Sequence, residues 1–184
     1  MIVDMPTVES SVLVLVDVQE RLIAAMDRRE EVLNRIELLL NGAAALQCDV
    51  LVTEQYPRGL GGTLPPLKAL LPAGTPVIEK TDFSVFGEAG FRSALASKRR
   101  THLVFCGIEA HVCVQQSVFD AINAQYQAIV AGDAVTSRKA ADRECALASY
   151  RQAGAQVWSV ESILFQWLRT AKHPAFKTIS KLVR

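Results

Sequence analysis

Short apolar runs alternate along the chain with longer segments in which apolar residues recur at helical spacing. Residues 11–16 (SVLVLV) form a continuous apolar run that stops at Asp17, a pattern typical of a strand buried on both faces. Residues 30–47 instead place apolar side chains three or four positions apart, as a helix with one buried face does. The same two patterns predict further strands at residues 50–53, 77–79, 102–106, 127–131 and 156–159, and further helices at residues 88–97, 112–125, 139–153 and 161–170.

Strand and helix segments that alternate in this way predict a parallel sheet covered on both faces. The fold class is therefore α/β, a three-layer α/β/α arrangement around a six-stranded, mostly parallel, doubly wound sheet of Rossmann-like type. A length of 184 residues suits one domain, so residues 1–184 are predicted to form a single unit. A Gly- and Pro-rich stretch at residues 57–76 interrupts the regular pattern. The basic tail after Thr170 is interpreted as a solvated extension or an oligomer contact.

Composition narrows the class of protein. With 20 Lys and Arg against 19 Asp and Glu, the net charge of +1 gives no electrostatic reason to expect nucleic acid or an anionic membrane as a partner. No apolar run approaches the roughly 18 residues of a membrane span, and the first residues do not resemble a signal peptide. The four cysteines are widely spaced without a CxxC pair, which favours a reducing compartment, the cytoplasm, over disulfides or zinc.

Three reactive side chains converge on one edge of the predicted sheet. Asp17 ends the first strand, Lys80 ends the third, and Cys113 follows the fourth after a short turn. Ligands of open parallel sheets bind at the carboxyl ends of the strands. A nearby ammonium and a helix N-terminus both favour a thiolate, and a carboxylate can act as its general base. We therefore expect Cys113 to be a nucleophile, with Asp17 as base and Lys80 as charge partner.

Each of these residues also has a structural interpretation. An Asp after a buried strand is often a turn residue or a cap, a Lys is usually solvated, and a Cys beside an apolar helix is usually core. The convergence of the three residues favours catalysis more than any one of them does alone.

Longer motifs surround these three residues. They are residues 15–19 (LVDVQ), 79–84 (EKTDFS) and 106–114 (CGIEAHVCV), and with them the sequence resembles the isochorismatase-like cysteine hydrolase superfamily. Residues 53–61 (TEQYPRGLG) and 173–177 (HPAFK) look more narrowly like the isochorismatase domain-containing subgroup. The resemblance covers nearly the whole chain in the same order.

The resemblance implies a mechanism. Its members use an Asp, Lys and Cys triad, here Asp17, Lys80 and Cys113, to hydrolyse small amides through a covalent thioester. They also carry a non-proline cis peptide before the nucleophile, which falls here at Ile108–Glu109 and directs backbone amides at the oxyanion. The metal-binding histidines of the nicotinamidase branch are missing after the second strand, so we expect no metal and no cofactor.

Several further residues are predicted to contact a small-molecule substrate. Gln19, Gln55 and Tyr56 lie near strand ends, and Phe83 follows Lys80, where it lines either an apolar wall or ordinary core. His111 either contacts substrate or orders the turn by hydrogen bonds.

Two other predictions concern the protein as a whole. The family implies a homo-oligomer, a dimer or larger, for which the segment from residue 161 offers apolar residues (Ile163, Leu164, Trp167, Leu168). The alternative to a hydrolase is a catalytically idle binding or scaffold protein, and an activated Cys113 that senses redox state is a third interpretation.

Overall fold

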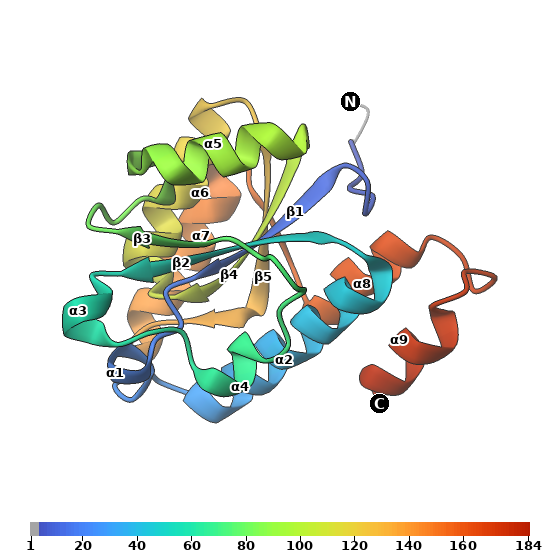
Figure 1. The fold of residues 1–184 in the computed structure, drawn as a ribbon, viewed down its shortest axis with the longest axis horizontal. Helices are drawn as coiled ribbons and strands as arrows, with labels where there is room; N and C mark the ends of the chain where they lie inside the picture. The colour runs from blue at the N-terminus through green and yellow to red at the C-terminus, as the bar shows by residue number, and fades with distance from the viewer. Residues whose placement is uncertain (1–3) are drawn as a thin grey trace.

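The computed structural model describes residues 4–184 and contains one six-stranded parallel sheet (Figure 1). The strand order is β3-β2-β1-β4-β5-β6, and every neighbouring pair is parallel. This confirms the predicted fold class. The strands are β1 (Ser11–Val16), β2 (Asp49–Gln55), β3 (Val77–Lys80), β4 (His102–Ile108), β5 (Gln127–Thr136) and β6 (Gln156–Trp158).

Helices cover both faces of this sheet. One layer consists of α5 (Ala89–Lys98), α6 (Gln115–Asn123) and α7 (Ala140–Gln152), and the other of α2 (Arg29–Leu46), α8 (Val160–Leu168) and α9 (Phe176–Leu182) (Figure 1). Shorter helical elements occupy the connections: α1 (Glu20–Ile23), α3 (Pro57–Leu60), α4 (Pro65–Lys68), the 3₁₀ turn η1 (Val85–Gly87) and the π-helical turn η2 (Ala110–Val114). That residues 1–184 form a single domain stays a prediction.

The apolar run of β1 explains why the sheet has a core on each side. Leu13 and Leu15 pack with α2 and α8, whereas Val12, Val14 and Val16 pack with α5 and α6. All of them are fully buried. Successive side chains of a strand point to opposite faces, so a strand between two helical layers must be apolar at every position.

Two segments are more ordered than the sequence predicts. The Gly- and Pro-rich stretch holds α3 and α4, each begun by a proline that is tolerated in a first helical turn. The tail after Thr170 is not a solvated extension, because α9 buries Ile179 completely in the core beside α2. The many basic residues of this segment made its short amphipathic helix hard to recognise from the sequence.

The apolar residues of α8, which the sequence offers for an oligomer contact, lie in the core. Ile163, Leu164, Trp167 and Leu168 are buried within this chain and leave little surface for a second copy. Leu164 packs against α2 so closely that a Cβ at Gly42 would lie 2.3 Å from its Cδ2 atom. These side chains therefore form core, and the prediction that they supply an oligomer contact is wrong.

Candidate active site

The topology marks one place on the sheet as a binding site. After β3 the chain returns to the other side of β1, so the crossovers on the two sides of the β1–β4 pair run in opposite directions. In doubly wound sheets, ligands bind in the crevice at this reversal, outside the carboxyl ends of the strands. Asp17 follows β1 and Cys113 follows β4, so both lie at this switch point.

The pairing of β1 with its neighbours fixes the position of Asp17 at the carboxyl end of the sheet. Val16, the last residue of β1, pairs with Thr53 on β2 and with Gly107 on β4. Gly107 has φ +115°, and a Cβ on it would lie 2.1 Å from the carbonyl oxygen of Val16. Only glycine allows the two strands to approach this closely. Asp17 itself turns out of the strand with φ 52°.

Asp17 and Lys80 form a buried ion pair. The distance from Lys80 Nζ to Asp17 Oδ2 is 2.7 Å, and both side chains are fully buried. Thr53 donates a hydrogen bond of 2.7 Å from its hydroxyl to the other carboxylate oxygen, Asp17 Oδ1. Burial raises the pKa of the Asp17 carboxyl, although Lys80 and Thr53 stabilise its charged form.

The ammonium group of Lys80 has other acceptors besides Asp17. Its Nζ donates to Gln55 Oε1 at 2.6 Å, to the carbonyl of Asp82 at 3.1 Å and to the carbonyl of Phe83 at 3.0 Å. An ammonium has three protons, so these three acceptors share them with the Asp17 carboxylate. Within residues 4–184, no donor is well directed at Asp17 Oδ2. The carboxylate is nonetheless in contact with the ammonium of Lys80, and the thiol of Cys113 is a further hydrogen-bond partner.

Cys113 lies in η2 directly before α6, and 7 % of its surface is exposed. Burial raises the pKa of its thiol to about 12, and the charge of Asp17 adds to this while Lys80 opposes it. Lys80 favours the thiolate, as the sequence predicts, whereas loss of hydration and the charge of Asp17 act in the opposite direction. The thiol of Cys113 is a hydrogen-bond partner of the Asp17 carboxylate.

Side chains from other elements fix the turn before Cys113. The Ile108–Glu109 peptide is cis, at the position that the resemblance implies. Glu109 Oε2 accepts hydrogen bonds from the backbone N–H and Nε of Arg138, at 3.2 and 3.0 Å. The buried hydroxyl of Tyr150 donates to the carbonyl of Ala110. The backbone of the turn is thus held from α7 and from the segment after β5.

Two of the predicted substrate contacts have structural partners instead. Gln19 is fully buried, and its amide donates to the carbonyls of Gln55 and Gly61 at 3.0 and 2.6 Å, so the prediction that it binds substrate is corrected. It fixes the segment that carries Gln55. Gln55 in turn spans Lys80 and the carbonyl of Thr81, to which its amide donates at 2.8 Å. Gln55 therefore orients the ammonium.

His111 is tied to the segment after β5. Its Nδ1 lies 2.9 Å from Ser137 Oγ, and its Nε2 lies 3.9 Å from Asp142 Oδ2. Of the two interpretations left open by the sequence, this geometry favours a hydrogen-bonded residue that orders the turn.

Exposed aromatic side chains lie beside the buried cluster of Asp17, Lys80 and Cys113. Tyr56 is 54 % exposed and Phe83 is 52 % exposed. A cavity of about 290 Å³ is lined by Tyr56 and by the β3 segment around Lys80, and one of about 450 Å³ by Phe83 and Phe86. Phe83 is therefore not ordinary core, and both aromatic residues stay candidates for substrate contact.

Three buried residues that hydrogen-bond within this region are not predicted from the sequence. They are Thr53, which bonds to Asp17, and Ser117 and Tyr150, which bond to carbonyls of the turn that holds Cys113. A signal existed for two of them: Thr53 is a polar residue that follows an apolar strand run, and Ser117 is a small polar residue one helical turn after Cys113.

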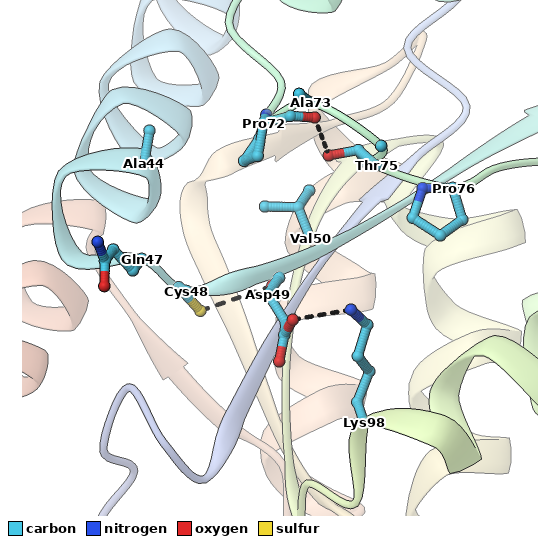
Figure 2. A pocket seen from close by; sticks show the side chains of 11 residues that line it. Ala44, Gln47, Cys48, Asp49, Val50, Pro72, Ala73, Thr75, Pro76 and Lys98 are labelled. Atoms are coloured by element: carbon cyan, nitrogen blue, oxygen red, sulfur yellow. Dashed lines mark hydrogen bonds and ion pairs between the residues drawn. The ribbon is translucent and has the colours of Figure 1, made fainter.

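Another hollow lies at the opposite, amino edge of the sheet (Figure 2). It measures about 450 Å³ and includes Cys48, Asp49, Pro72 and Lys98. Its charged groups are paired, since Lys98 Nζ lies 2.8 Å from Asp49 Oδ1. Between residues 4 and 184, no cluster of three or more His, Cys, Asp and Glu side chains suits a metal ion. No helix in the same range is long and apolar enough to cross a membrane.

The fold and the cluster at its switch point define a doubly wound α/β protein with a carboxylate, an ammonium and a thiol at the carboxyl edge. Residues 11–162 match the model of the isochorismatase domain, and the chain belongs to the isochorismatase family, whose members are hydrolases.

Relatives resemble the chain over nearly its whole length. Isochorismatase domain-containing protein 2A of Mus musculus is 37 % identical over 96 % of this chain and 84 % of its own length. A structure of the MAR1 ribonuclease of Caenorhabditis elegans is 34 % identical and has a TM-score of 0.93, covering 97 % of this chain and 92 % of that one.

A more distant structure shares the fold. The YcaC gene product of Escherichia coli, described as an octameric hydrolase of unknown specificity, superposes with a TM-score of 0.92 at 20 % identity. The match covers 99 % of this chain and 90 % of that one.

Proposed function

We propose that this protein is a metal-independent cysteine hydrolase that cleaves the C–N bond of a small amide. The observation that supports this most directly is the contact of the buried Cys113 thiol with the buried Asp17 carboxylate, which is itself paired with Lys80. A buried carboxylate with a raised pKa is a stronger proton acceptor than an ordinary one. The cluster therefore contains both the nucleophile and its base.

The first half of the reaction forms a thioester. Asp17 takes the thiol proton as Cys113 Sγ attacks the carbonyl carbon of the amide, and the negative charge moves to the carbonyl oxygen. Backbone N–H groups of the turn around Ile108 and Glu109 stabilise that oxyanion. The positive charge of Lys80 stabilises the negative charge that moves from the thiol to the carbonyl oxygen. The protonated Asp17 then gives its proton to the nitrogen, which leaves as ammonia or an amine.

The second half regenerates the enzyme. Asp17 removes a proton from a water molecule, which attacks the thioester carbon, and the acid leaves as Cys113 recovers its proton. The mechanism needs no metal and no cofactor.

A panel of small uncharged amides tests this function. Ammonia release and the mass of the intact protein are measured for the wild type, for Cys113→Ala and for Cys145→Ala, which removes the exposed thiol. We expect turnover and an acyl adduct on Cys113 in the wild type. Cys113→Ala should lose at least about 10³-fold in kcat, and Cys145→Ala should lose nothing.

The alternative is a binding or scaffold protein with an idle site. Such a protein would keep its affinity for the same amides in Cys113→Ala, show no ammonia release, and form no adduct. A redox sensor would instead show reversible oxidation of Cys113 without hydrolysis.

A second candidate function comes from the Caenorhabditis elegans relative that is called a ribonuclease. The closed cluster argues against it here, since a nucleophile with 7 % exposure has little room for a polynucleotide. Labelled RNA is incubated separately with the wild type and with Cys113→Ala, and its cleavage is compared between the two. Cleavage by the wild type alone would overturn the amide proposal and the expectation that no nucleic acid binds.

We also infer a homo-oligomer, a dimer or larger. The exposed rings of Tyr56, Phe83 and Phe165 support this, and the Escherichia coli protein of the same fold is described as octameric. Light scattering on the eluting protein measures the mass directly, and a mass of 20.1 kDa would contradict the inference. A cytoplasmic location is proposed from the four free cysteines, which persist in a reducing compartment.

A further inference from the structure

Ser117 connects the two segments that carry the reactive groups. It lies on α6, one turn after Cys113, and is fully buried. Its hydroxyl donates to the carbonyl oxygen of Cys113 at 2.6 Å and accepts from the backbone N–H of Val85 at 3.0 Å. One hydroxyl thus joins the backbone of the nucleophile to the first residue of η1.

The segment that ends at Val85 is the one that holds the ammonium. It begins at Lys80, and the carbonyls of Asp82 and Phe83 accept two of the protons of Lys80 Nζ. Its far end is attached to Ser117. Movement of this segment relative to α6 would move the ammonium relative to the sulfur, and the hydrogen bonds of Ser117 oppose that movement.

From this geometry we infer that Ser117 is a positioning residue that sets the place of Lys80 relative to Cys113. The inference rests on the proposed function, because it concerns the same nucleophile. Lys80 is the charge that favours ionisation of the thiol, and a Coulomb interaction weakens as its distance grows. A loosened Lys80 therefore lowers the reactivity of Cys113, even though the hydrogen bonds of Ser117 reach the backbone and neither of these side chains.

The chain contains a matched control. Ser149 on α7 donates to the carbonyl of Cys145 at 2.9 Å, the same bond across four residues that Ser117 makes to Cys113. Such bonds are common for serine in helices and have only a local effect. Ser117 differs by its burial and by its second bond, to Val85, which reaches another segment.

The test measures alkylation of Cys113 by iodoacetamide between pH 6 and 9, together with the melting temperature. Peptide mass spectrometry separates Cys113 from the other thiols. Ser117→Ala should slow the reaction of Cys113 about three- to tenfold at neutral pH, and Ser117→Thr, which keeps the hydroxyl, should restore most of the rate. Ser149→Ala should leave the rate unchanged. Ser117→Val, which has the shape of the threonine variant without its hydroxyl, serves as the deletion if the alanine variant does not fold.

A merely structural role predicts the opposite sign. Loosening of the turn alone would lower the melting temperature, admit water to a buried thiol and speed its alkylation. An equal or faster rate in Ser117→Ala therefore overturns the inference. Lys80→Ala separates this result from failure of the proposed function: if that variant also reacts like the wild type, Lys80 does not activate Cys113 and the catalytic proposal fails as well. If only Lys80→Ala is slow, the role of Ser117 alone is wrong.

Discussion

Two Asp–Lys ion pairs of nearly equal length lie at opposite edges of the same sheet. Asp17 and Lys80 are 2.7 Å apart at the carboxyl edge, and Asp49 and Lys98 are 2.8 Å apart at the amino edge (Figure 2). The first pair is fully buried, whereas the side chains of the second are 23 % and 30 % exposed. The pKa of the two carboxyls moves in opposite directions.

The hydrogen bonds of each pair explain this difference. Although its partial burial acts to raise it, hydrogen bonds from Lys98 and Arg100 hold the pKa of Asp49 below its usual range. Arg100 donates to Asp49 Oδ2 from Nε and from its second guanidinium nitrogen, at 3.1 and 2.9 Å. Burial instead raises the pKa of Asp17. The distance within an ion pair therefore does not fix the pKa of its carboxyl group: burial dominates at Asp17, whereas the hydrogen bonds and charges of two cations together outweigh partial burial at Asp49.

Stability should show the largest contrast between the pairs. Lys80→Ala leaves a buried carboxylate without its counter-charge and should lower the free energy of unfolding by about 3–5 kcal/mol. Lys98→Ala removes one of two cations from a half-exposed carboxylate and should cost about 1 kcal/mol or less. Urea unfolding of both variants measures the difference. Equal losses would show that the two pairs do not differ in solvation as the structure indicates.

Reactivity should show the next contrast. Asp17→Asn removes the negative charge that raises the pKa of Cys113, so the thiol should ionise more easily. Alkylation of Cys113 near pH 8 should become roughly three- to tenfold faster, while amide hydrolysis is lost with the base. Asp49→Asn is the control and should change neither rate. Slower alkylation in Asp17→Asn would mean that its charge does not suppress the thiolate.

Acid titration should show the smallest effect. A carboxyl with a lowered folded-state pKa stabilises the protein above its unfolded pKa of about 3.9, and this contribution disappears as the pH falls through the folded value. Asp49→Asn lacks the group, so its unfolding free energy should fall less than that of the wild type below about pH 4, by about 1 kcal/mol or less. Unfolding curves at pH 3 and pH 6 measure this. Parallel losses in both proteins would contradict the assigned role of Asp49.

Local patterns were sufficient for the strands and for the main helices. β1 was predicted with the bounds that the structure has, because a short, continuous apolar run between polar ends is typical of a strand buried on both faces. α9 was missed because its apolar face is only a few residues wide among lysines. The Gly- and Pro-rich stretch contains two short helices that the sequence pattern did not predict. Proline is typical both of a break in regular structure and of the first turn of a helix, so its presence was ambiguous.

The sequence predicted that the three reactive side chains converge, but not how they influence one another's charge. Asp17, Lys80 and Cys113 follow strands of a parallel sheet, so their convergence follows from topology. The raised pKa of the Cys113 thiol does not, because it depends on how fully the site excludes water and on the charges of Asp17 and Lys80. Nor could the sequence show that the Gln19 side chain bonds only to backbone groups, donating to the carbonyls of Gln55 and Gly61 and accepting from the N–H of Gln55.

The sequence by itself determined the alternation of strands and helices, hence the doubly wound sheet and the edge at which Asp17, Lys80 and Cys113 meet. Only the tertiary structure decided how the protons are shared there. Three acceptors from Gln55, Asp82 and Phe83 share the protons of Lys80 with the carboxylate of Asp17. These partners come from separate loops, whose distances are set by packing across the whole domain and not by any local pattern of residues.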